Sequence, residues 1–118
     1  MNRSKVIGHA KARARELAEA GFTPPQPEVL SLPGPSGKSS LLSAARGEAE
    51  LGRLTVNDLA VADALATVLT GGATDPLFPM TERQIMALER EATLSLARRP
   101  ATFERIEHML VSGKPLRN

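Results

Sequence analysis

The stretch of this sequence that comes closest to a chemical motif is Gly34-Pro35-Ser36-Gly37-Lys38-Ser39, which looks like a phosphate-binding loop. In a nucleotide-binding loop the backbone N–H groups wrap the phosphates, and a glycine must stand five residues before the second one. Leu32 occupies that position, and Pro33 and Pro35 remove donors that the loop would need. We therefore interpret the stretch as a turn into a helix, at whose start Lys38 and free N–H groups could attract a phosphate.

Histidines and acids give no further set with the geometry of an active site. A metal site needs three or four convergent ligands, whereas His9 and His108 lie in separate predicted helices without companions. Glu104 and His108 are one helical turn apart, which favours a surface contact. Two carboxylate pairs are interpreted as solvated faces: Glu89 with Glu91, and Glu104 with Glu107. We predict no catalytic residue and no metal ligand in this chain.

Composition sets the class of protein that can carry these residues. The chain has 118 residues, a net charge of +2 and no cysteine, so it forms no disulfide and no thiolate site. Its aromatic residues are three phenylalanines, and a core of Ala, Leu, Ile, Val and Met suits helices better than a sheet. Lys and Arg alternate with acids, which argues against a nucleic-acid binder. No apolar run is long enough for a membrane span, and we expect a cytoplasmic protein.

The elements expected from this composition form a single all-α domain over residues 1–118. We predict four to five helices in a small orthogonal or irregular bundle: a helix within 1–21, a Pro-rich strap over 22–37, and a helical bundle over 38–118. The first helix should run from about Ser4, its N-cap, to Ala20. The second should begin between Ser36 and Lys38 and end by Leu51. Apolar residues of the strap could pin it to the core: Phe22, Val29, Leu30 and Leu32.

Clear start signals define the three later helices. Thr55 with Asp58, and Thr81 with Gln84, have capping-box spacing, and Pro100 suits the first turn of a fifth helix that Gly113 ends. Gly71-Gly72 should end the third helix, and Arg98 and Arg99 should lie in the last turn of the fourth. Apolar stripes should face inward from each helix: Leu41, Leu42, Ala45 and Ala49; Leu59, Ala62, Leu65, Ala66 and Leu69; Ile85, Leu88, Ala92 and Leu96; Phe103, Ile106, Met109 and Leu110. Leu77 and Phe78 should also turn inward.

The final run, LEREATLSLARRPATFERIEHMLVSGKPLRN over residues 88–118, resembles a known family. It is similar to the carboxyl end of bacterial 3-hydroxyacyl-CoA dehydrogenases that carry a fused enoyl-CoA hydratase (crotonase) domain. Weaker likeness extends over nearly the whole chain, in four runs: Asn2–Ala18, Gly21–Pro25, Gly34–Leu42 and Leu65–Gly72. Thr93 stands where the family usually has Phe, and Phe22 replaces the usual Tyr.

The resemblance implies a fatty-acid β-oxidation enzyme whose catalytic parts lie elsewhere. The NAD-binding turn and the hydratase carboxylates of such enzymes have no counterpart in this chain, so the chain carries no catalytic set of its own, whatever the whole enzyme does. NAD would serve the full-length enzyme, with no cofactor in this chain. The resemblance implies a structural helical module that covers the crotonase core, contributes to oligomerisation and borders the CoA site. Its partners would be the rest of that polypeptide or its own copies.

Two other interpretations remain open at this point. An independent module could hold the phosphates of acyl-CoA or another anion with cationic residues at helix ends: Lys38, Arg98, Arg99 and Lys114. Alternatively, a small helical protein could meet a partner through its apolar stripes. The sequence leaves open whether the chain is a piece or a free-standing protein. If it is a piece, its exposed Leu and Ile could drive self-association.

Overall fold

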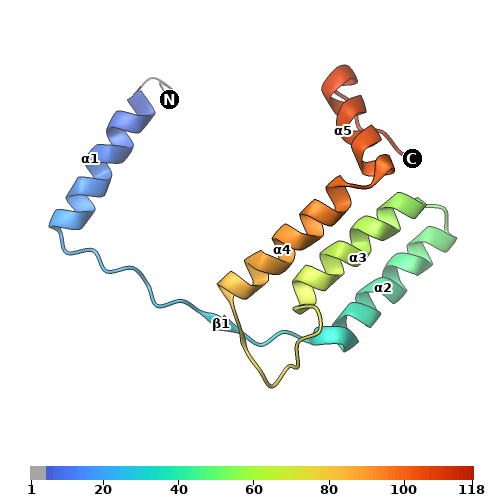
Figure 1. Cartoon of the computed structure of the whole chain (residues 1–118), viewed down its shortest axis with the longest axis horizontal. Helices are drawn as coiled ribbons and strands as arrows, with labels where there is room; N and C mark the ends of the chain where they lie inside the picture. The colour runs from blue at the N-terminus through green and yellow to red at the C-terminus, as the bar shows by residue number, and fades with distance from the viewer. Residues whose placement is uncertain (1–4) are drawn as a thin grey trace.

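The computed structural model describes residues 5–118, and helices make up most of them (Figure 1). The helices are α1 (Val6–Glu19), α2 (Gly34–Glu50), α3 (Val56–Thr70), α4 (Glu82–Ala97) and α5 (Pro100–Ser112). Two short strands, β1 (Val29–Leu30) and β2 (Met80–Thr81), pair antiparallel, with Val29 opposite Thr81 and Leu30 opposite Met80. The predicted all-α class is confirmed, and the five helices agree with the four to five that were predicted.

Helices α2, α3 and α4 lie side by side and form one layer, with α3 in the middle (Figure 1). The described chain measures 57 × 46 × 23 Å. Most domains bury their apolar surface between two or more packed layers. The described residues supply only one layer, and this explains why so few side chains are fully buried.

The centre of the layer is built from small residues of α3. Ala66 is 3% exposed and Thr70 is 2% exposed, and the Thr70 hydroxyl donates to the Ala66 carbonyl at 2.7 Å. Small side chains let neighbouring helices approach closely. On either side, residues of the predicted stripes are half-buried: Leu42, Ala45 and Ala49 of α2, and Ile85, Leu88, Ala92 and Leu96 of α4. The inward direction predicted for the α4 stripe is therefore correct, but Leu41, Leu65 and Leu69 are exposed.

The predicted capping signals are confirmed at α3 and α4. The Thr55 hydroxyl accepts from the Asp58 N–H and the Asp58 carboxylate accepts from the Thr55 N–H, and Thr81 and Gln84 form the same reciprocal pair. Gly71 and Gly113 follow α3 and α5 in left-handed conformation, which glycine adopts without strain. Pro100 begins α5 as predicted. Because α4 ends at Ala97, Arg98 and Arg99 occupy the junction between α4 and α5 instead of the last turn of α4.

Helix α2 begins at Gly34, earlier than the predicted start between Ser36 and Lys38. Pro35 lies in its first turn, where a missing N–H costs nothing because that group has no partner inside the helix. Gly34 is buried with φ +60°, and a Cβ there would overlap the Thr74 carbonyl oxygen. This close approach requires glycine and shortens the Pro-rich strap at its carboxyl end.

The strap is fixed mainly by its backbone. Phe22, Val29 and Leu30 are 59%, 60% and 42% exposed, so the prediction that their side chains pin the strap to the core is wrong. The β1–β2 pairing attaches the strap to the start of α4, and Leu32 is half-buried. Leu77 and Phe78, predicted to turn inward, are 83% and 70% exposed in the loop before β2.

Helix α1 stands apart from the layer at the far end of the strap (Figure 1). All of its residues are exposed except Leu17, which is half-buried. The helix lies within the predicted bounds, and Gly21, in left-handed conformation, follows its carboxyl end as predicted. The predicted N-cap, Ser4, lies outside the described residues. None of the described helices combines the length and the apolar character needed to cross a membrane.

Helix α5 is oriented opposite to the prediction. Its half-buried residues are Ala101, Thr102, Arg105 and His108. The stripe predicted to face inward is exposed instead: Phe103 by 61%, Ile106 by 46%, Met109 by 46% and Leu110 by 81%. The reason is a set of polar contacts around Arg105.

Candidate functional site

The predicted anion-binding residue, Lys38, lies one turn inside α2 and already has an acidic partner. Its Nζ is 2.9 Å from Asp63 Oδ1 on α3, and the two side chains are 28% and 53% exposed. The Ser36 hydroxyl donates to the Pro33 carbonyl at 2.9 Å, as expected for a turn that leads into a helix. An anion at Lys38 would have to compete with Asp63. Its predicted contact with a CoA phosphate stays a prediction.

The residues considered as metal ligands or paired acids are not brought together. His9 lies on the isolated α1 and His108 on α5. Glu104 accepts a hydrogen bond from the Asn118 side-chain amide at 2.9 Å. Over residues 5–118, no group of three or more His, Asp or Glu residues is placed to hold a metal ion.

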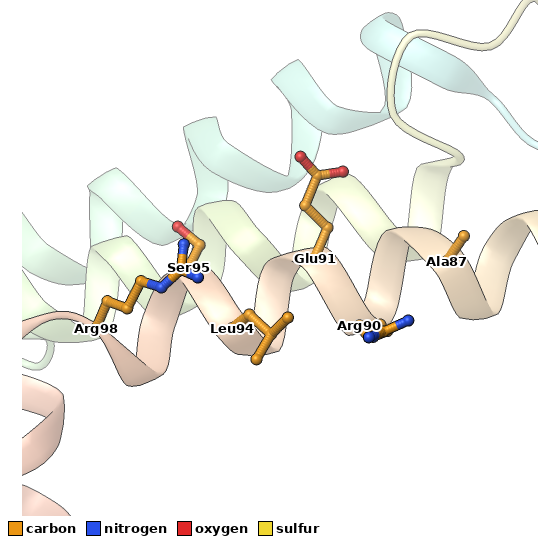
Figure 2. A pocket seen from close by; sticks show the side chains of 6 residues that line it. All are labelled: Ala87, Arg90, Glu91, Leu94, Ser95 and Arg98. Carbon is orange, nitrogen blue, oxygen red and sulfur yellow. The ribbon is translucent and has the colours of Figure 1, made fainter.

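A shallow hollow of about 560 Å³ lies along α4, and its lining comes from α4 and from Arg98, the residue that follows this helix (Figure 2). The lining residues are Ala87, Arg90, Glu91, Leu94, Ser95 and Arg98. Figure 2 shows Glu91 and Arg90 pointing to different sides of the helix, so their charges do not converge on one position. This surface therefore lacks the convergent groups of an active site.

A second, smaller hollow of about 210 Å³ follows the seam between α3 and α4. Its lining is mostly apolar: Val61, Ala64, Leu65 and Val68 from α3, and Ala92, Thr93 and Leu96 with the charged Glu89 from α4. Such a groove can accept an apolar side chain from another surface, and it holds no acid–base pair for chemistry.

The most highly connected polar site of the described chain is centred on Arg105, which the sequence analysis did not single out. Its guanidinium donates to Asp58 Oδ1 at 2.7 Å through Nη1 and to Asn118 Oδ1 at 2.7 Å through Nε. Nη2 donates to the Thr55 hydroxyl at 3.1 Å and to the Asn118 main-chain oxygen at 2.9 Å. Three segments far apart in the sequence therefore meet on one side chain, and we call these four residues the Arg105 clasp.

The local elements explain how the clasp is positioned. Thr55 and Asp58 are fixed by the capping box of α3, in which Asp58 Oδ2 accepts from the Thr55 N–H at 2.8 Å. That leaves Asp58 Oδ1 free for Arg105. Arg and carboxylate form short, charge-assisted hydrogen bonds, and the planar guanidinium presents several donors in a rigid arrangement. The cap predicted from sequence is thus also half of a long-range contact.

The electrostatics of Asp58 follow from these contacts. The hydrogen bond from the Thr55 backbone and the one from the Arg105 side chain lower the pKa of Asp58 from 3.8 to about 2, against a smaller opposing effect of burial. Asp58 and Arg105 are 24% and 23% exposed. A strongly ionised carboxylate with a permanent cation partner is suited to hold structure, and it is a poor proton acceptor near neutral pH.

Sequence alone carried one signal for this site. The spacing of Thr55 and Asp58 marked the cap, but nothing in the run Glu104–His108 indicated that Arg105 would point toward it. No local pattern in the sequence indicated that Asn57 would be buried, at 3% exposure. Its side-chain N and O atoms form no hydrogen bond with the described residues.

Comparisons with known proteins give one informative match. No protein-family model matches the chain, and no solved structure matches it significantly. All 118 residues align at 36% identity with a probable 3-hydroxyacyl-CoA dehydrogenase of Bacillus subtilis (strain 168). The chain spans only 15% of the length of that relative. Over its whole length, then, this chain resembles one part of a 3-hydroxyacyl-CoA dehydrogenase.

Proposed function

We propose that this chain is a non-catalytic helical segment of a 3-hydroxyacyl-CoA dehydrogenase of the kind fused to a crotonase domain. Its role is structural: it covers another part of the enzyme, contributes to subunit contacts and borders the CoA site. NAD and the acyl-CoA substrate are handled by the remainder of the enzyme, in the cytoplasm. The whole-length likeness to a small share of a dehydrogenase supports this proposal.

The observation that carries the proposal is the single layer of helices with its apolar residues uncovered. Large apolar side chains of α3, α4 and α5 are exposed: Leu65, Leu69, Met86, Leu94, Phe103, Ile106, Met109, Leu110 and Val111. Exposed large apolar side chains on neighbouring helices indicate contact with another protein surface. Neither the hollow along α4 nor the one on the α3–α4 seam brings an acid, a base and a nucleophile to one position, so contact is the function that the geometry supports best.

A chimera tests this role. The matching 118 residues of the Bacillus subtilis relative are replaced by this chain, and NAD-dependent oxidation of 3-hydroxybutyryl-CoA is measured. We expect the chimera to fold and to retain activity, because the new segment offers the same covering surface. A chimera that is soluble and folded, but has lost its assembly state and its activity, would contradict the structural role.

Activity and ligand binding of the isolated chain separate this proposal from the acyl-CoA-binding alternative. We expect no hydration of crotonyl-CoA and no shift of the melting temperature with saturating acyl-CoA. A ligand that binds only the folded state would add about 2.7 kcal/mol at a hundredfold excess over Kd. A shift that Lys38→Ala abolishes would favour the alternative instead.

A further inference from the structure

We propose that the segment Leu116–Asn118 acts as a latch that holds α5 with its polar side against α3 and its apolar side outward. The latch is inferred from hydrogen bonds within this chain alone. Its use, keeping an apolar docking face available, rests on the proposed structural function. Two groups of contacts and the outward direction of the α5 apolar stripe carry the inference.

The first group joins the latch to α5 itself. Asn118 receives hydrogen bonds from Arg105 on its side-chain oxygen and its main-chain oxygen. Its side-chain amide donates to the Ala101 carbonyl at 3.0 Å and to Glu104 Oε2 at 2.9 Å. Asn118 therefore contacts the first two turns of α5 at three residues and fixes the helix around its own axis.

The second group joins the latch to the layer. Arg117 Nη2 donates to the Arg53 carbonyl at 2.6 Å, within the turn that connects α2 and α3. Arg105 reaches Asp58 and Thr55 at the start of α3. The segment after α5 thus folds back and ties α5 to the α2–α3 corner, next to the place where Figure 1 shows the chain ending.

The third observation is that α5 has an apolar stripe that the latch keeps away from the layer. Burying Phe103, Ile106 and Leu110 would be favourable, because removing apolar surface from water lowers the free energy. The charge-assisted hydrogen bonds of Arg105 oppose that rotation, since turning α5 would leave Asp58 without its partner. Asn118 accepts from the same guanidinium through its side-chain and main-chain oxygens, so the latch keeps Arg105 toward Asp58 and the apolar stripe outward.

Hydrogen exchange measures the latch directly in the full chain. The variant Asn118→Ala removes the side-chain contacts of the latch and changes no residue of the Asp58–Arg105 pair or of the α3 cap. We expect amide exchange across Pro100–Ser112 to accelerate about tenfold or more, with exchange in α3 unchanged. Arg105→Ala should accelerate α5 further. The matched control is Arg83→Ala, an exposed arginine on α4, which should leave α5 unchanged.

A fluorescent reporter shows the direction in which α5 faces. The chain has no Trp or Tyr, so Phe103→Trp introduces a single indole on the outward side. With the latch intact we expect emission typical of an exposed indole, and with Asn118→Ala added we expect a blue shift as the stripe turns inward. The proposal would be overturned if Asn118→Ala changed neither the amide exchange of α5 nor the emission of the Phe103→Trp indole.

The outcomes separate the latch from the proposed function. Faster α5 exchange together with a failed chimera would support the latch and count against the dehydrogenase role. An active chimera whose activity and α5 exchange both survive Asn118→Ala would support the role and refute the latch. Global unfolding by Arg105→Ala does not affect this test, because Asn118→Ala keeps the capping box of α3.

Discussion

Helices α4 and α5 are neighbours in the chain and have the same kind of apolar stripe, yet they point it in opposite directions. In α4 the residues Ile85, Leu88, Ala92 and Leu96 are the half-buried ones. In α5 the large apolar residues are exposed, and the half-buried side includes Arg105 and His108. The two helices therefore test what an amphipathic pattern can predict.

The difference comes from what each helix meets. Helix α4 lies along α3 and can bury its stripe against a surface of small and apolar residues. Helix α5 contacts the α2–α3 corner, where Thr55 and Asp58 present oxygen atoms. The Asp58 carboxylate forms a charge-assisted hydrogen bond with an arginine. Covering it with a leucine would instead bury its charge without a partner, which is unfavourable. An apolar stripe thus predicts that some apolar partner exists, without identifying it.

The largest expected effect comes from comparing two single substitutions, one in the apolar stripe of α4 and one in that of α5. Leu88→Asp places a charge at the half-buried seam of α4 and should lower the free energy of unfolding by about 2–3 kcal/mol. Leu110→Asp, on a side chain that is 81% exposed, should change it by less than about 0.5 kcal/mol. Urea denaturation followed by circular dichroism measures both. Equal losses would show that α5 buries its stripe in solution.

The next effect is the pH dependence that Asp58 gives to the contact between α3 and α5. Its pKa is lowered in the folded chain from 3.8 to about 2. The stabilisation is therefore fully present above the unfolded value and is lost as pH falls through about 2. It amounts to at most about 2 kcal/mol. Denaturation midpoints measured from pH 5 to pH 2 should fall less steeply in Asp58→Asn than in the natural sequence, and identical slopes would contradict the shift.

A smaller effect distinguishes the two capping boxes. Thr81→Val should cost about 1 kcal/mol, the usual value of an N-cap. Thr55→Val should cost about 0.5–1 kcal/mol more, because its hydroxyl also accepts from Arg105 Nη2 at 3.1 Å. The same urea titrations give the two values. If Thr81→Val proved as costly as Thr55→Val, the Arg105 contact would contribute no stability.

The smallest effect concerns α1, which packs on neither of the compared helices. Arg13 and Glu16 form an exposed pair at 3.0 Å, with side chains 69% and 62% exposed. Arg13→Ala should change the free energy of unfolding by less than about 0.5 kcal/mol. A loss above about 1 kcal/mol would show that α1 packs against the layer, and would extend the comparison to a third helix.

Local signals in the sequence were sufficient for most of the helix ends. Thr55 with Asp58, Thr81 with Gln84, Pro100 and the glycines after the helices marked element ends, because caps and turns depend on residues only a few positions apart. The start of α2 was placed too late. Pro35 suggested an extended strap, but a proline is compatible with the first turn of a helix, and α2 begins at Gly34.

The direction in which the apolar side of a helix faces, and the contacts between distant residues, were decided by the tertiary structure. Spacing could list the apolar residues of α5, but the oxygen atoms at the corner of α3 determined that they face outward. Arg105 is 47 residues away from Asp58 and 13 residues away from Asn118 along the chain, and no local pattern links the three. Their meeting depends on the packing of whole helices, since a side chain finds its hydrogen-bond partner only after the backbones are in place.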